Sequence, residues 1–151
     1  MCGIVGYIGD KSAKEVIIKG LKRLEYRGYD SAGIATMESN KLAITKTSGK
    51  VNDLISCIPN DFHNGKIGIG HTRWATHGEP NNKNAHPHSD ISGKFTLVHN
   101  GIIENYNSLK KLLADKGITC QTDTDTEVLV QFIAYLYKED KLSVVETIRL
   151  A

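Results

Sequence analysis

The first nine residues of the chain read MCGIVGYIG, and Cys2 is the most informative of them. Gly3–Gly9 is an apolar run, which predicts a short buried strand. Because the residue after Met1 is small, we expect Met1 to be removed, so that Cys2 becomes the N-terminus. An α-amino group titrates near about 7.7–8.0, so part of it is neutral at physiological pH. A nucleophilic thiol and its own base then share one residue, although a Met-Cys start also arises by chance.

The composition excludes several kinds of protein. The chain has 151 residues, a formal net charge of +2 and three cysteines. Such a small net charge without a basic run argues against nucleic acid or an anionic membrane as a partner. No apolar stretch approaches the roughly 18 residues of a membrane span. Three cysteines cannot all pair, and no secretion signal precedes them, so we expect a cytoplasmic protein.

Short strands and helices alternate along the chain, which favours a mixed α and β domain. Capping boxes at Ser12–Glu15, Thr124–Glu127 and Ser143–Glu146 predict three helix starts. We also expect helices at 53–58 and 104–116, and strands at 32–37, 41–47, 67–71, 95–99 and 118–121. Ser39-Asn40 predicts a hairpin turn, and residues 79–93 predict a long irregular loop. The expected inward side chains of the later helices are Leu109, Leu112, Leu113, Leu129, Phe132, Ile133 and Leu136.

Two segments contain residue types that bind metals, but their spacing does not match a known metal-binding motif. Five histidines lie between residues 71 and 99, but no CxxC or HExxH motif accompanies them. The acidic run Asp123–Glu127 lacks the glycine of a calcium loop, because Val128 stands in its place. We therefore expect no metal. Cys57 and Cys120 lie in apolar surroundings, which predicts small buried side chains.

Several motifs together carry a resemblance to a known family. They are Met1–Gly6, Leu24–Gly33, His71–Gly78, Asn84–His88, His99–Asn105 and Thr122–Glu127. In this order they resemble the glutaminase domain of class II glutamine amidotransferases, from Cys2 to about Val130. The versions of Leu24–Gly33 and Thr72–Gly78 are similar to those of the branch that delivers ammonia to fructose 6-phosphate.

The resemblance implies a catalytic role for three residues. Cys2 corresponds to the nucleophile that attacks the glutamine side-chain amide, with its free amine as the base. Asn100 and Gly101 correspond to an oxyanion hole made of one side-chain amide and one backbone N–H. From the residues alone, Asn100-Gly101 also fits a two-residue hairpin turn, although the helix predicted from Glu104 leaves no second strand for it.

The resemblance also implies a glutamine-binding site. Arg73 corresponds to the residue that binds the α-carboxylate, for which a planar guanidinium is well suited. Thr76, His77 and Trp74 correspond to its neighbours in the pocket. Asp125 corresponds to the partner of the α-ammonium group, although a carboxylate in the first turn of a helix is also an ordinary capping residue. Arg27 and Asp30 correspond to supporting residues beside the nucleophile, where we expect an ion pair.

The implied fold is α+β, part of an αββα sandwich of the N-terminal nucleophile hydrolase type with antiparallel sheets flanked by helices. Family domains are longer than 151 residues, so we expect residues 1–151 to be an incomplete glutaminase domain, without the later strands or the sugar-isomerase domains. The resemblance implies no cofactor, and homo-oligomers of the full-length enzyme. The alternatives are a stand-alone glutaminase or amidotransferase subunit, and an inactive fragment.

Overall fold

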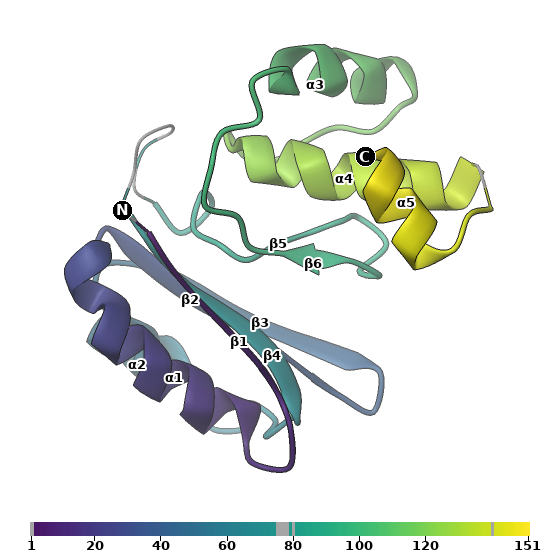
Figure 1. The fold of residues 1–151 in the computed structure, drawn as a ribbon. Coiled ribbons are helices and arrows are strands. Elements are labelled where there is room, and N and C mark those ends of the chain that lie inside the picture. Colours follow the sequence, from purple (N-terminus) through teal and green to yellow (C-terminus); the bar gives the residue numbers. More distant parts are fainter. Residues whose placement is uncertain (1, 75–78, 80, 140) are drawn as a thin grey trace. The chain divides into compact units, whose positions relative to one another are not determined.

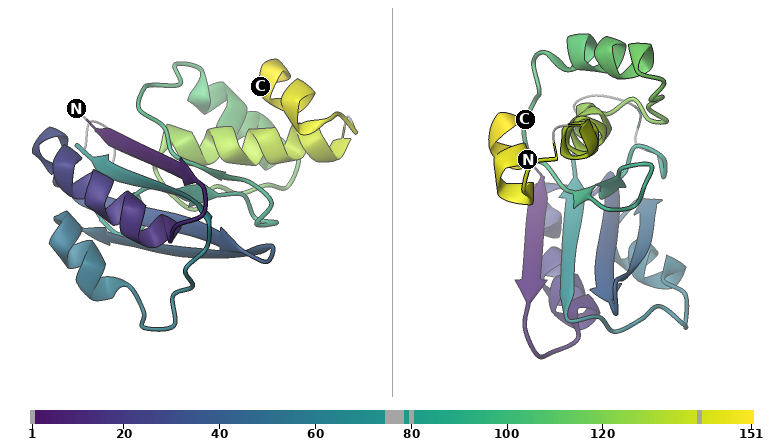
Figure 2. Two further views of the ribbon diagram at one scale, coloured as in Figure 1. Left: turned by 60° about the horizontal axis from the view of Figure 1, so that its bottom comes forward. Right: turned by 90° about the vertical axis from the view of Figure 1, so that its right-hand side faces the viewer.

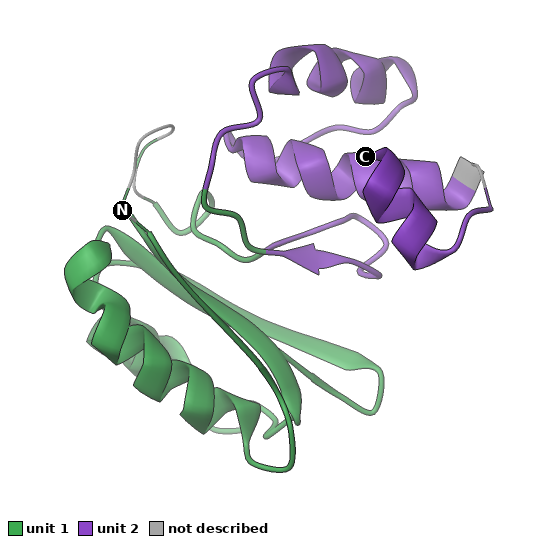
Figure 3. Ribbon diagram, viewed as in Figure 1, with its two compact units in different colours: residues 1–87, 98–100 green, residues 88–97, 101–151 purple. Residues whose placement is uncertain are grey.

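The computed structural model describes residues 2–74, 79, 81–139 and 141–151, and these form two units. Unit 1 contains residues 1–87 and 98–100, and unit 2 contains residues 88–97 and 101–151 (Figure 3). No helix in the described part of the chain is long and apolar enough to cross a membrane.

Unit 1 is built on a four-stranded antiparallel sheet in the order β1-β4-β2-β3 (Figure 1). Its strands are β1 (Gly3–Ile8), β2 (Ser31–Glu38), β3 (Lys41–Ser48) and β4 (Ile67–Arg73). The predicted turn between β2 and β3 is confirmed, because Ser39 and Asn40 have φ values of 49° and 62°. Positive φ at both central residues gives a turn whose twist matches that of the strands it joins.

Two helices, α1 (Ala13–Leu24) and α2 (Val51–Cys57), cover one face of this sheet (Figures 1 and 2). Of the capping box predicted at Ser12–Glu15, the serine half is confirmed, since Ser12 Oγ accepts a hydrogen bond from the Glu15 backbone N–H. A short 3-10 turn, η1 (Glu25–Arg27), follows α1, and the Glu25 carboxylate accepts the Val51 N–H at 2.7 Å at the start of α2. The core beneath the helices is made of Ala13, Ile17, Leu21, Ala32, Ile34, Val51, Leu54 and Phe62.

Glycines on β4 allow α1 to pack closely. A Cβ atom at Gly70 would lie 2.3 Å from Cγ2 of Ile17, closer than real Cβ atoms come. Because side chains alternate along a strand, His71 and Arg73 lie on the opposite face from Gly70 and α1.

The segment 81–87 lies over that opposite face. The Lys46 ammonium group donates hydrogen bonds to the carbonyl oxygens of Lys83, Ala85 and Pro87 at 3.1, 2.8 and 3.3 Å. The strand beneath it, β2, has no side chain at Gly33, and a Cβ atom there would lie only 2.0 Å from the His86 carbonyl oxygen. Since Gly33 pairs with His71 across the sheet, this segment covers His71.

Unit 2 contains a two-stranded ladder of β5 (His88–Ser89) and β6 (Thr96–Leu97), and three helices. The helices are α3 (Tyr106–Asp115), α4 (Asp125–Glu139) and α5 (Val144–Leu150). Helix α4 is the centre of the unit, because α3, α5, β5 and β6 all contact it. The capping box predicted at Ser143–Glu146 is confirmed in both directions.

The start of α4 differs in part from the predicted capping box. Thr124 Oγ1 accepts the Glu127 N–H at 3.3 Å, as expected for a cap. The Glu127 carboxylate, however, accepts the N–H groups of Gln121 and Thr122, at 2.8 and 2.5 Å. It therefore anchors the segment that precedes the helix.

Two strand predictions in this region need correction. The predicted strand 118–121 is wrong: Ile118 N–H donates to the Leu113 carbonyl at the end of α3, and Gln121 N–H donates to Glu127. These two N–H groups donate to a helix end and to a side chain, so they are not available for a ladder. The predicted strand 95–99 is reduced to β6, because its partner β5 is only two residues long.

Some predictions of burial are also wrong. β1 is not a buried strand, since Ile4 and Ile8 are 41% and 78% exposed. Leu112 is exposed, whereas Leu113 is fully buried. In α4 the buried side chains include Val128, Val130 and Gln131 besides Ile133, because several elements surround the helix. Cys57 is exposed and Cys120 is half-buried.

Candidate functional site

Strand pairing positions the thiol of Cys2. Gly3 pairs with Thr72, so Cys2, which directly precedes β1, lies beside the end of β4. Its Sγ accepts the backbone N–H of Trp74 at 3.2 Å and lies 3.6 Å from the Trp74 carbonyl oxygen. A Cβ atom at Gly3 would lie 2.8 Å from both Leu24 Cβ and Thr72 Oγ1, so glycine is the residue that fits next to Cys2.

The side chain of Asn100 links Cys2 to β4. Its Nδ2 donates to the Cys2 carbonyl oxygen at 3.2 Å, and its Oδ1 lies 2.7 Å from Nε2 of His71. An amide NH2 group has two N–H bonds, and the Cys2 carbonyl takes one of them. Unit 1 therefore brings together two of the predicted site residues, Cys2 and Asn100, whose positions in the sequence are 98 residues apart.

His71 was not predicted as a site residue, yet it is the buried group behind Asn100. It is 1% exposed, and its ring stacks on that of His86 with centroids 4.2 Å apart and planes at 18°. Burial lowers the pKa of His71 to about 4, against the smaller raising effect of its hydrogen bonds to Asn100 and to the His99 backbone. The nearby positive charge of Arg73 also lowers this pKa, so the ring is neutral at pH 7.

Arg73 is the last residue of β4, and Trp74 follows it beside Cys2. Arg73 is buried, with 5% of its surface exposed, whereas Trp74 is 42% exposed and meets the ring of Tyr29 edge-on at 5.2 Å. The Asp30 backbone N–H donates to the Arg73 carbonyl at 3.1 Å. The segment that contains Arg27 and Asp30 therefore runs beside the end of β4, and the ion pair expected between these two residues stays a prediction.

The remaining predicted residues lie in unit 2 or outside the described part. Gly101 is exposed, and Asp125 is the first residue of α4. The Asp125 carboxylate accepts the Ile103 N–H at 2.8 Å and the Thr126 hydroxyl at 3.3 Å. An ionised carboxylate has about four acceptor positions, so these two bonds do not exhaust it. Thr76 and His77 lie outside the described residues, and so does Met1.

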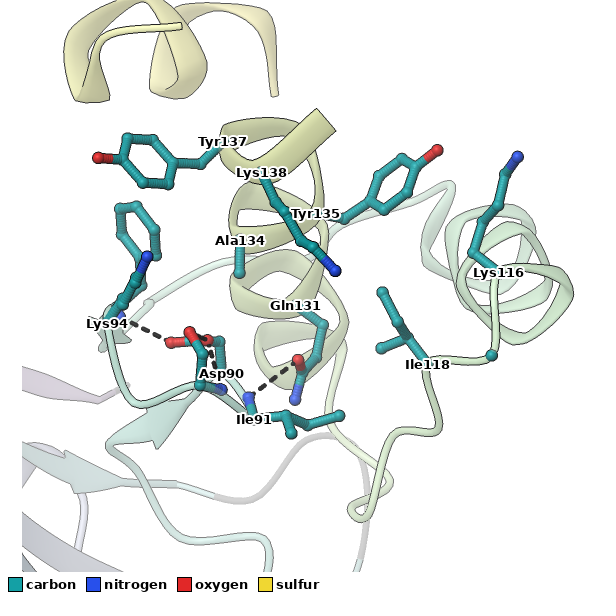
Figure 4. A pocket seen from close by; sticks show the side chains of 13 residues that line it. Asp90, Ile91, Lys94, Lys116, Ile118, Gln131, Ala134, Tyr135, Tyr137 and Lys138 are labelled. Carbon is teal, nitrogen blue, oxygen red and sulfur yellow. Dashed lines mark hydrogen bonds between the residues drawn. The ribbon is translucent and has the colours of Figure 1, made fainter. Parts of the chain in front are cut away.

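A separate pocket lies in unit 2 (Figure 4). It has a volume of about 700 Å³ and is lined by residues of the 90–95 segment, of the segment 116–118 that follows α3, and of α4. The Lys94 ammonium group lies 5.6 Å above the ring of Tyr137, and the Ile91 N–H donates to Gln131 at 3.2 Å. Of the residues predicted for glutamine binding or catalysis, none that the structure describes lines this pocket. Among the residues with described positions, no cluster of three or more His, Cys, Asp or Glu could hold a metal ion.

Comparison with known families adds to this geometry. The sequence profile of the glutamine amidotransferase domain matches residues 59–145. The chain belongs to this family.

Curated relatives in the amidotransferase family are similar over almost the whole chain. Glutamine–fructose-6-phosphate aminotransferase (isomerizing) of Caldanaerobacter subterraneus is 53% identical over 149 residues, which is 99% of this chain and 24% of the relative. The enzyme of the same name from Listeria innocua is 54% identical over 151 residues, 100% of this chain and 24% of the relative. The enzyme from Pyrococcus horikoshii is 57% identical over 133 residues, which is 88% of this chain and 22% of the relative. This chain thus spans about a quarter of the length of these relatives.

Solved amidotransferase structures confirm the expected α+β fold of the N-terminal nucleophile hydrolase type. Glutamine phosphoribosylpyrophosphate amidotransferase from B. subtilis, complexed with ADP and GMP, matches with a TM-score of 0.81 and 30% identity. The match covers 98% of this chain and 31% of that one. A structure described as the allosteric regulatory enzyme of purine biosynthesis matches with a TM-score of 0.80 at the same identity, over 98% of this chain and 32% of that one.

Proposed function

We propose that this chain hydrolyses glutamine, with Cys2 as the nucleophile and Asn100 as one donor of the oxyanion hole. The observation that carries this proposal is the hydrogen bond from Asn100 Nδ2 to the Cys2 carbonyl, which holds a side-chain amide against the backbone of the nucleophile's own residue. The Trp74 N–H at 3.2 Å from Sγ supports the same role, because a donor to sulfur stabilises negative charge on it.

The proposed reaction is acyl transfer. The Cys2 sulfur attacks the side-chain carbonyl carbon of glutamine, and the carbonyl oxygen becomes an oxyanion. Asn100 donates its second amide N–H to that oxygen, and loss of such a donor typically costs about 10²–10³ in kcat. The C–N bond then breaks, and the departing nitrogen takes the proton that the thiol passed to the free amine of Cys2 and leaves as ammonia. Water hydrolyses the γ-glutamyl thioester, which releases glutamate and restores the thiol.

The remaining roles in this proposal follow the family resemblance. Gly101 supplies the second oxyanion donor through its backbone N–H, and the free amine of Cys2, once Met1 is removed, acts as the base. Arg73 binds the α-carboxylate of glutamine, with Trp74, Thr76 and His77 around it, and Asp125 binds the α-ammonium group. Arg27 and Asp30 support the strand that carries the nucleophile.

We further propose that the whole protein passes this ammonia to fructose 6-phosphate to form glucosamine 6-phosphate. The support is that the relatives named for this reaction are 53–57% identical to the chain, whereas the phosphoribosylpyrophosphate enzyme is 30% identical. Residues 1–151 then form the incomplete glutaminase domain, and sugar-isomerase domains elsewhere in the protein bind the sugar phosphate. The protein is cytoplasmic, forms homo-oligomers and needs no cofactor.

The test is labelling of the intact protein with a diazoketone analogue of glutamine, followed by intact and peptide mass analysis. We expect one adduct on Cys2, blocked by excess glutamine, and no glutamine hydrolysis by Cys2→Ala. Cys57→Ala is the matched control, because Cys57 is an exposed free thiol remote from these contacts in the sequence. Burial and the Glu127 carboxylate raise the pKa of the Cys120 thiol, so it competes poorly for the reagent. Normal hydrolysis by Cys2→Ala would refute the proposal.

A further inference from the structure

The contact between His71 and Asn100 fixes which ring nitrogen carries the hydrogen. Nδ2 of Asn100 donates to the Cys2 carbonyl, so Oδ1 is the atom that faces His71 Nε2 at 2.7 Å. An amide oxygen only accepts hydrogen bonds, so Nε2 must be the donor. The neutral ring then has its hydrogen on Nε2.

We propose that His71 is a positioning residue that holds the Asn100 amide with its NH2 group toward Cys2. This inference rests on the proposed function, in which that NH2 group donates to the oxyanion. An amide that rotates by half a turn would present its oxygen to Cys2 instead, and two acceptors would then face each other. The donor on His71 opposes this rotation, because the rotated amide would also place its NH2 group against the Nε2–H.

The surroundings of His71 suit a fixed and uncharged donor. Its ring is 1% exposed and stacked on that of His86, so tilting the ring out of this plane would move both side chains. His86 lies in the segment that Lys46 holds through three carbonyl oxygens, so the stack is anchored to β3. Burial disfavours the charged ring, so the second ring nitrogen stays unprotonated at neutral pH.

Substitutions of His71 in the intact protein separate donor loss from simple loss of packing. Gln places an amide NH2 near the position of Nε2, whereas Asn reaches only the position of Nδ1 and Leu has no donor. We expect His71→Gln to keep kcat for glutamine hydrolysis within about threefold of the parent, and His71→Leu and His71→Asn to lower it at least about tenfold, with little change in KM. His63→Leu is the matched control, because His63 is a half-buried ring of unit 1 bonded to Thr36 at 3.2 Å, and it should leave kcat unchanged.

A double-mutant cycle with Asn100 tests whether His71 acts through that residue. In an Asn100→Ala background, the proposal expects His71→Leu to cause no further fall in kcat. An equal fall in both backgrounds would mean that His71 only supports the fold, and the proposal would be wrong. Full activity of His71→Leu, or equal loss in the Gln and Leu variants, would also overturn it.

The state of the ring gives a readout that does not depend on glutamine. Nitrogen-15 NMR of the intact protein labelled at histidine should show His71 as neutral with its hydrogen on Nε2 at pH 7, and Asn100→Ala should shift the Nε2 signal. If Cys2→Ala hydrolyses glutamine normally, the proposed function fails, and this spectrum alone decides the positioning role. A hydrogen on Nδ1, or a charged ring at pH 7, would refute it.

Discussion

Replacing Gly33 by Ala would place a methyl group 2.0 Å from the His86 carbonyl oxygen and 2.8 Å from Cβ of Lys46. Real Cβ atoms essentially never come closer than 3.0 Å to such neighbours, so the segment at His86 must move by about 1 Å or the sheet must give way. Hydrogen bonds from the Lys46 ammonium group hold that segment in place, and the shortest of them, to the Ala85 carbonyl oxygen, is 2.8 Å long. A displacement of this size breaks one or more of these bonds.

The expected cost combines two effects. Overpacking in a closed site costs about 1–3 kcal/mol, and a lost hydrogen bond to a charged group costs about 1.5–3 kcal/mol. Because movement of the segment relieves part of the overlap, we expect a total of about 3 kcal/mol. For a domain of this size that lowers the Tm by about 6–12 °C. If the proposed function holds, kcat falls by up to about 10²-fold, since His86 supports His71.

Thermal melting of the intact protein and hydrogen–deuterium exchange of peptides from 31–48 and 79–88 measure this effect. Gly6→Ala is the matched control, because Gly6 is a strand glycine of the same sheet with nothing within 4 Å of an added Cβ. It should be neutral, or stabilising by about 0.4–1 kcal/mol through the unfolded state. Equal melting temperatures and equal exchange in the two variants would refute the reasoning.

Two further predictions concern the core and the pH dependence of stability. Ile17→Ala should lower the free energy of unfolding, measured by chemical denaturation, by about 2–5 kcal/mol, because Ile17 is fully buried. Ile8→Ala is the control and should lower it much less, because the Ile8 side chain is 78% exposed. Equal losses would contradict the packing described for α1. The pKa of His71 is about 4 in the folded chain and 6.5 as its ordinary value, so the unfolded state binds more protons between these values. The contribution of the neutral His71 ring to the free energy of unfolding is therefore fully present above about pH 6.5 and decreases by roughly 3 kcal/mol as the pH falls toward 4. Replacing the ring in His71→Gln should remove this decrease from the pH profile of unfolding.

Local signals in the sequence predicted much of the fold. The caps at Ser12 and Ser143 and the turn at Ser39-Asn40 depend on atoms within three or four residues of each other, and all three are confirmed. The wrong strand at 118–121 has an apolar start but no partner strand, and the N–H groups of Ile118 and Gln121 bond instead to the end of α3 and to Glu127. A strand needs a neighbouring strand, and the local pattern does not report whether one is present.

The sequence by itself also indicated Cys2 and, through its motifs, Asn100 as parts of one site. Only the tertiary structure decided how they meet: the register Gly3 to Thr72 carries Cys2 to the Trp74 N–H, and Asn100 reaches the Cys2 carbonyl from 98 residues away. His71 begins one of the family motifs but was assigned no role, since its sequence neighbours do not reveal burial or a hydrogen bond to Asn100. Burial and strand register are set by residues far apart in the chain, and therefore the neutral histidine behind Asn100 becomes visible only in the folded protein.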